Sequence, residues 1–193
     1  MSLCTRTLAL FFLMAQPFWE QRPPEQWTLD EIAQMRSNSP WAQPIGQVAP
    51  VTAFLATAAP IEQAEEELRL RLKKNPHPLP EPDPDYTDYL RDHRGDALVL
   101  GVAYPPMDTF GKPGEDKLME QQTAMVVGHK EYRILGYFPP TPSDPVLRLV
   151  FPRAVKATDK NVQFRLYLPG LSFPERDAGF AVKDLMYQGK LAM

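Results

Sequence analysis

Proline is the residue type that most limits what this chain can fold into. The 193 residues include 22 prolines against 10 glycines. Because proline fixes its own φ angle and has no backbone N–H, it interrupts helices and the interior of sheets. The sequence therefore predicts short elements joined by ordered turns. The densest run, residues 75–85, alternates proline with other residues and predicts an extended connector within one domain.

An unbroken apolar run, residues 7–15, follows the early positive charge of Arg6. It is too short to span a bilayer, which needs roughly 20 apolar residues, and it has the length of a signal-peptide core. We therefore expect residues 1–15 to be a signal peptide and residues 16–193 to be one exported domain, periplasmic or extracellular. Cys4 precedes the run, so the mature chain would contain no thiol. The alternative is an uncleaved apolar segment, through which alone the chain would contact a membrane.

The balance of charges limits the kinds of partner. Lys and Arg number 21 and Asp and Glu number 24, which gives a net charge of -3. Proteins that bind nucleic acid usually carry clustered basic residues on a basic domain. This composition argues against a nucleic-acid partner.

Two main helices are predicted in the first half of the chain. Thr28 and Glu31 have the spacing of a capping box, which marks a helix start, and Pro40 requires that helix to end near residue 38. Residues 61–74 carry an apolar stripe with charged residues around it. Pro60 suits the first position of this second helix, where no N–H is needed.

The second half of the chain has the pattern of β-strands. Residues 162–168 alternate apolar and polar side chains, which predicts a strand with one buried face. The turn at 158–161 makes this strand a neighbour of 146–151, and residues 108–116 are expected to be a loop. The remaining expected elements are a short helix at 86–93 and strands at 48–58, 97–104, 123–127, 132–138 and 180–187.

These elements predict an α+β fold. We expect a mostly antiparallel sheet of five to seven strands with the two main helices packed on one side. The alternative architecture is a closed β-sandwich formed by residues 97–193.

Several tempting sites fail on spacing. Residues 111–114 read Gly-Lys-Pro-Gly, which is not the order of a phosphate-binding loop. The acidic residues between 81 and 88 lack the glycine and glutamate of a helix-loop-helix calcium site. The three histidines, His77, His93 and His129, show no zinc-ligand spacing, and no serine has glycine neighbours typical of a nucleophile. The sequence therefore assigns no metal, no cofactor and no catalytic residue.

Two sets of side chains remain candidates. The tryptophans Trp19, Trp27 and Trp41 all lie in the first 41 residues, where they either form a binding face or fix the N-terminal arm to the sheet. A hydrolase would instead need two carboxylates in one cleft. Its candidates are Asp96, Asp108, Glu115 and Asp184.

Several short segments resemble a group of exported bacterial proteins of unknown function. They are residues 39–41, 45–60, 151–153, 158–164 and 180–191. The resemblance implies secretion and one sheet-rich domain, and it brings no catalytic residues. We hypothesise a non-enzymatic binding or scaffolding domain of the cell envelope with a protein or peptide partner. Edge strands at 132–138 and 162–168 could accept an added peptide strand, and a carboxylate-pair hydrolase is the alternative.

Overall fold

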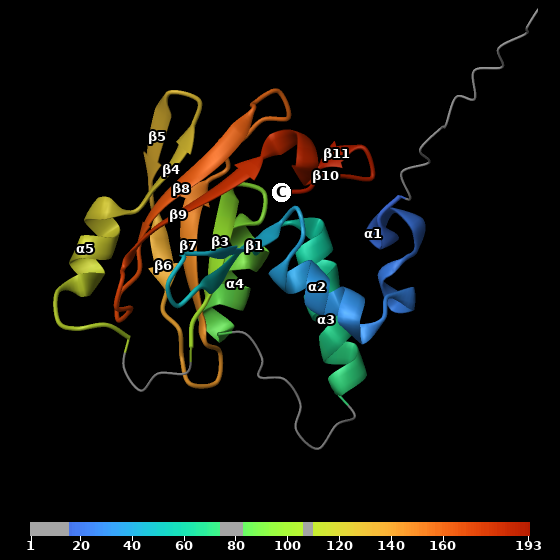
Figure 1. Ribbon diagram of the computed structural model, residues 1–193, viewed down its shortest axis with the longest axis horizontal. Helices are drawn as coiled ribbons and strands as arrows, with labels where there is room; N and C mark the ends of the chain where they lie inside the picture. Colours follow the sequence, from blue (N-terminus) through green and yellow to red (C-terminus); the bar gives the residue numbers. More distant parts are fainter. Residues whose placement is uncertain (1–15, 74–82, 106–109) are drawn as a thin grey trace, which may run out of the picture.

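A computed structural model describes residues 16–73, 83–105 and 110–193 (Figure 1). The expected signal peptide lies outside the described residues, as does most of the expected connector. The helices are α1 (Phe18–Gln21), η1 (Pro24–Gln26), α2 (Leu29–Ser37), α3 (Ala59–Leu72), α4 (Pro84–His93), α5 (Glu115–Gln122) and η2 (Val182–Leu185). The strands are β1 (Ala42–Ile45), β2 (Val51–Leu55), β3 (Ala97–Ala103), β4 (Ala124–Val127), β5 (Lys130–Arg133), β6 (Gly136–Phe138), β7 (Val146–Pro152), β8 (Asn161–Tyr167), β9 (Glu175–Ala181), β10 (Met186–Tyr187) and β11 (Lys190–Leu191).

The strands form two main sheets and one small hairpin. The first sheet has the order β1-β2-β3-β7-β6, the second has the order β5-β4-β8-β9, and β10 pairs with β11. Neighbouring strands are antiparallel throughout. The expected α+β class with an antiparallel sheet is confirmed. The strands are divided between two main sheets, where the sequence predicted one.

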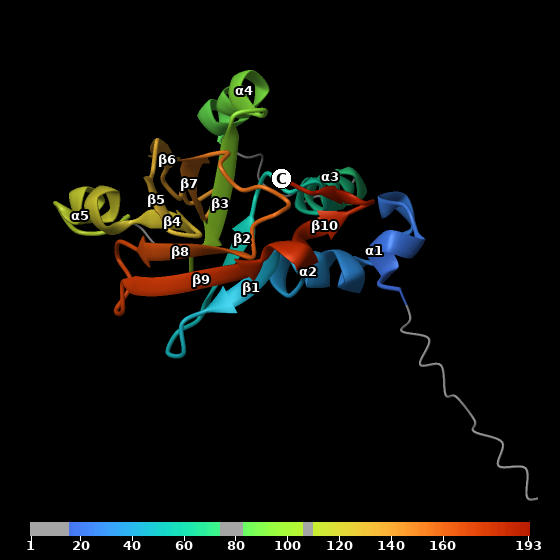
Figure 2. The ribbon, with the colours of Figure 1, turned by 90° about the horizontal axis from the view of Figure 1, so that it is seen from above.

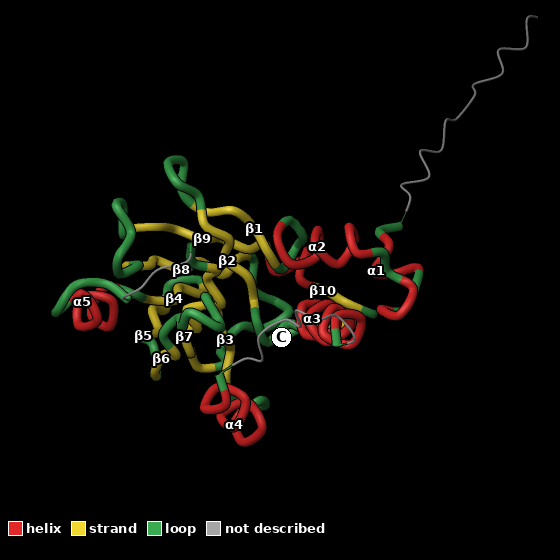
Figure 3. The backbone as a smooth tube through the Cα atoms, turned by 90° about the horizontal axis from the view of Figure 1, so that it is seen from below, coloured by secondary structure: helices red, strands yellow, loops and turns green. Residues whose placement is uncertain are grey.

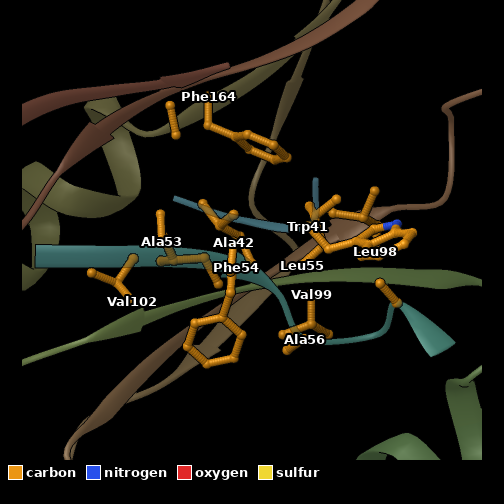
Figure 4. Packing of buried hydrophobic residues seen from close by; sticks show 14 of the residues in the cluster. Trp41, Ala42, Ala53, Phe54, Leu55, Ala56, Leu98, Val99, Val102 and Phe164 are labelled. Atoms are coloured by element: carbon orange, nitrogen blue, oxygen red, sulfur yellow. The ribbon is translucent and has the colours of Figure 1, made fainter. Parts of the chain in front are cut away.

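The main core lies between the facing sheets. The rings of Phe151 on β7 and Phe164 on β8 have their centres 5.3 Å apart across the two layers. Figure 4 shows Phe164 on the same side of β2 as Ala53, with the Phe54 ring on the opposite side. The predicted pairing of 146–151 with 162–168 is therefore wrong: the two strands belong to opposite sheets and meet through their buried faces.

The sheets are also joined at their edges. The segment expected as one strand, 132–138, is split, because β5 ends in the second sheet and β6 begins in the first. Between them the Leu135 N–H donates to the Val150 carbonyl at 2.7 Å. At the other edge the Gln43 side-chain amide donates to the Gly179 carbonyl at 2.7 Å, linking β1 to β9. These links hold the layers in one barrel-like body.

Two helices pack against each other beside β1 and β2. The capping box at the start of α2 is confirmed: the Glu31 N–H donates to the Thr28 hydroxyl, and the Thr28 N–H donates back to the Glu31 carboxylate. Ile32 and Met35 of α2 are fully buried, as is Ile61 of α3. Apolar burial therefore fixes this helix pair to the sheet.

Two further helices lie away from that pair (Figure 2). Helix α4, expected at 86–93, lies on the outer face of the first sheet. Helix α5 lies at the opposite end of the molecule from the β10–β11 hairpin (Figure 1). It was missed, because its first two residues fell in the loop predicted at 108–116 and no element was predicted for the rest. Gly114 adopts φ +91° and redirects the chain into Glu115–Gln122, whose residues are mostly good helix formers.

Candidate functional site

Two of the three candidate tryptophans belong to the core. Trp27 and Trp41 are almost completely buried. The Trp41 indole N–H donates to the Leu185 carbonyl at 3.3 Å, and its ring meets the Tyr187 ring edge-to-face. The Trp27 indole N–H donates to the Arg22 carbonyl at 3.0 Å. These contacts give both rings a packing role, which was the alternative to a binding face.

Trp19 is half-buried and connects the N-terminal arm to the body. Its ring centre lies 5.7 Å from that of Trp41 and 4.9 Å from that of Phe18. Phe18 in turn meets Trp27 edge-to-face. The three tryptophans are thus brought together through aromatic contacts, and a binding role for the partly exposed Trp19 stays a prediction.

A groove of about 950 Å³ is lined mainly by residues of α3 and α4. Figures 2 and 3 show α4 on the outer side of the first sheet and α3 beside the sheet. Its α3 wall carries carboxylates and guanidinium groups one helical turn apart. Its α4 wall carries both aromatic and basic side chains. Its lining includes Glu62, Glu65, Glu66, Arg69 and Leu70 from α3, Tyr86 and Leu90 from α4, and Arg94, which follows α4.

Arginines neutralise the carboxylates of the α3 wall. Glu62 pairs with Arg94 at 3.1 Å across the groove. Glu65 pairs with Arg69 at 3.7 Å and with Arg36 of α2 at 3.9 Å. Burial raises the pKa of the Glu62 carboxyl above its usual value; the Arg94 charge opposes this shift and the Glu65 charge adds to it. The negative charge of Glu62 is therefore less favourable in the folded chain than in water.

A buried ion pair supports α4 from below. Arg148 on β7 makes two hydrogen bonds to the Asp144 carboxylate, at 2.6 and 3.3 Å, and both side chains are largely buried. The guanidinium carbon lies 4.4 Å from the centre of the Tyr86 ring, a cation–π contact. The Asp83 N–H at the start of α4 also donates to Asp144, at 3.2 Å. This polar cradle, Asp83, Tyr86, Asp144 and Arg148, fixes the α4 wall of the groove.

The carboxylates predicted from sequence do not share a cleft in the described residues. Asp108 lies outside them, and Asp96 and Asp184 are exposed. Glu115 starts α5, at the opposite end of the molecule from the β10–β11 hairpin that follows Asp184 (Figure 1). Glu62 and Glu65, which share the groove, were missed, because their helix reads as an ordinary charged surface helix. Their spacing of three residues was the available signal.

The loop at 111–114 leads into α5, and a carboxylate of the chain occupies that helix start. Glu115 accepts the N–H groups of Lys112 at 2.8 Å and of Gly170 at 3.0 Å. These two backbone hydrogen bonds, the Lys112 one first, lower the pKa of Glu115. The loop therefore serves as a turn that fixes α5 beside the β8–β9 connection.

The histidines lie on separate elements. His93 stacks on Tyr89 of α4, with ring centres 4.6 Å apart, and His129 lies in the turn between β4 and β5. His77 lies outside the described residues. Across 16–73, 83–105 and 110–193, no three His, Cys, Asp or Glu side chains gather as a metal site.

The prediction that residues 162–168 form an edge strand able to accept a peptide strand is wrong. Strand β8 lies between β4 and β9, so its backbone is paired on both sides. Strands β5 and β6 are sheet edges, but β5 exposes Lys130, Glu131 and Arg133 and β6 has three residues. Charged and very short edges disfavour strand addition.

No helix within the described part of the chain is long and apolar enough to cross a membrane. Comparison with protein-family models, with curated proteins and with solved structures finds no match to this chain.

Proposed function

We propose that this chain is an exported, non-enzymatic binding domain of the cell envelope, and that a protein partner binds in the groove between α3 and α4. The single observation that carries the proposal is this large groove, which combines paired charges with exposed apolar surface. Its volume of about 950 Å³ is at the upper end of ligand sites. The N-terminal apolar run supports export.

The surface chemistry of the groove suits a protein partner. Leu70, more than half exposed, lies on the α3 wall beside the ion-paired Glu66 and Arg69, and Leu90 lies on the facing wall. Protein interfaces combine apolar contacts of this kind with a polar rim. Because β5 is charged and β6 is very short, we propose side-chain recognition in the groove as the binding mode in place of strand addition at these edges.

The pairing of the groove carboxylates with arginines favours binding over acid–base catalysis. Glu62, Glu65 and Glu66 each have an arginine within ion-pair distance. A general base of this kind must be free to take a proton from substrate. These groups instead form a network that can exchange partners with charges on an incoming surface.

Site-specific photocrosslinking in the cells that produce the protein tests the groove. A benzophenone side chain placed at Leu70 in the groove is expected to give a discrete adduct. The same side chain at Leu118 on α5, which is also exposed, is the matched control and is expected to give none. Equal adducts from both positions, or no adduct from Leu70, would contradict the proposal.

Export is tested separately. We expect the mature chain in the envelope or extracellular fraction, with residues 1–15 removed, as read by mass spectrometry of its N-terminus. A chain that begins at Met1 in the envelope fraction would favour an uncleaved segment. Intact chain in the cytosol would refute export.

A carboxylate-pair hydrolase is the second candidate, and one observation favours it. Glu62 has a raised pKa and Glu65, one turn away, has two arginine partners, so the two carboxyls occupy unlike environments. If this pair is catalytic, E62Q and E65Q each abolish hydrolysis of a fluorogenic glycoside panel by the purified chain. Absence of hydrolysis by the wild-type chain would leave the binding proposal as the sole candidate.

A further inference from the structure

Two hairpin tips from different sheets flank a second cavity, which is open to solvent. The β1–β2 tip and the β8–β9 tip approach each other at the same end of the sheets (Figures 1 and 2). Between them lies a cavity of about 400 Å³, lined by residues 47–48 and 172–176. It shares no lining residue with the α3–α4 groove. Its size is that of a small ligand rather than of a protein segment.

Apolar side chains stand exposed on both tips. Val48 is 60 % exposed on the first tip and Phe173 is 53 % exposed on the second. Ala49, next to Val48, has φ +49°, a conformation that residues other than glycine rarely adopt. This left-handed residue lies in the turn that carries Val48.

One cation lies in the wall of the cavity, and the chain fixes its position. The Nη2 group of Arg176 donates to the Val48 carbonyl at 3.2 Å, and the Nη1 group donates to the Glu175 carbonyl at 3.2 Å. Its guanidinium lies 5.9 Å from the Phe173 ring centre. Gly46, at φ +86°, leaves room for this arginine, because a Cβ there would lie 2.5 Å from the Arg176 Nε.

The positive charge of Arg176 has no anionic partner in the described residues. No carboxylate of the described chain lies within ion-pair distance of it, and its Nε is buried without a hydrogen-bond acceptor. Each Nη group has a second N–H beyond the one used.

We propose that this cavity binds a molecule that carries a carboxylate on an apolar body, with Arg176 holding the carboxylate and Val48 and Phe173 holding the apolar part. The remaining Nη hydrogens are charged donors that can bind a carboxylate oxygen. The Ser172 hydroxyl in the lining offers a further donor. The C-terminal residue of a peptide and a short fatty acid share this chemistry.

Titration of the full chain, followed by two-dimensional NMR, tests the proposal. The probes are N-acetyl-phenylalanine, its uncharged amide, and octanoate. We expect shifts confined to the hairpin tips and at least about tenfold tighter binding of N-acetyl-phenylalanine than of its amide. The acid that binds more tightly, N-acetyl-phenylalanine or octanoate, indicates whether the cavity prefers a peptide C-terminus or a fatty acid.

Matched variants complete the test. R176Q is expected to remove the preference for the acid, and R176K to keep part of it. R165Q, which removes an exposed arginine of β8, is expected to change nothing. The dispersion of the same spectra reports whether each variant is folded. If R176Q does not fold, F173S tests the same cavity, because it removes the ring proposed to hold the apolar part, and we expect it to weaken binding of the acid. Equal binding of acid and amide, an unchanged preference in R176Q, or no binding of any probe would overturn the proposal.

Discussion

The two walls of the α3–α4 groove are held to the sheet in different ways. Helix α3 packs with α2 through fully buried apolar residues such as Ile32 and Ile61, next to the buried Trp27. Helix α4 instead lies on the polar cradle, where the Arg148–Asp144 ion pair meets Tyr86. One wall therefore depends on apolar area removed from water, and the other depends on a charge pair that is stable only when complete.

This difference makes the α4 wall the more sensitive to single charges. Apolar packing tolerates small changes in volume, whereas a buried charge left without its partner is strongly destabilising. The contrast also suits a binding role, because within the described residues the Glu62–Arg94 ion pair links the two walls across the groove. The predictions below test this contrast.

The largest effect is expected in the apolar core, at Trp41 just before β1. Replacing Trp41 by Ala removes a fully buried ring and its contacts with Trp19 and Tyr187. We expect W41A to lower the free energy of unfolding by about 3–5 kcal/mol in urea titrations. F173A, at an exposed aromatic position, is the control and is expected to cost less than about 1 kcal/mol. Similar losses in both variants would refute the packing role of Trp41.

The next effect concerns the polar cradle. R148M leaves the Asp144 carboxylate buried with its principal partner gone. We expect a loss of about 3 kcal/mol in the free energy of unfolding. Adding D144N removes the unpaired charge of the Asp144 carboxylate, so the R148M/D144N double variant is expected to recover more than half of that loss. A double variant no more stable than R148M would show that the charge pair is not the cause.

A smaller and pH-dependent effect is expected at Glu62. Burial raises its pKa in the folded chain above the unfolded value, so its ionisation opposes folding as the pH rises through the folded pKa. E62Q should therefore be more stable than wild type at pH 7, by at most about 1 kcal/mol, since it also loses the Arg94 ion pair. The gain should vanish below the unfolded pKa of about 4.3. A stability gain of E62Q over wild type that grows toward acid pH would contradict the expected direction of the pH dependence.

The smallest effect, with the opposite sign, is expected at Glu31. The Thr28 N–H lowers the pKa of the Glu31 carboxyl, and the Thr28 hydroxyl and the contact with Arg22 add to this. Its contribution to stability is therefore present above the unfolded pKa and lost as the pH falls through the folded pKa. E31Q should lower the melting temperature slightly at neutral pH, and the difference should shrink in acid. A difference independent of pH would exclude the charge as its source.

The sequence predicted what depends on local pattern. The capping box at Thr28 and the alternation in β8 are properties of neighbouring residues, and the structure has both. The Phe151–Phe164 contact was not predictable, because a turn between two strands does not distinguish pairing in one sheet from facing across two. The polar cradle joins Tyr86 to Arg148, 62 residues apart, and no spacing rule connects a helix to a strand at that distance.

Hydrogen exchange measured by mass spectrometry tests most directly whether the two walls are held independently. In R148M, we expect exchange to accelerate far more in Pro84–His93 than in Ala59–Leu72. In W41A, we expect exchange to accelerate more in Ala59–Leu72 than in Pro84–His93. If either variant accelerates both helices equally, the walls form one cooperative unit and the contrast between them is wrong.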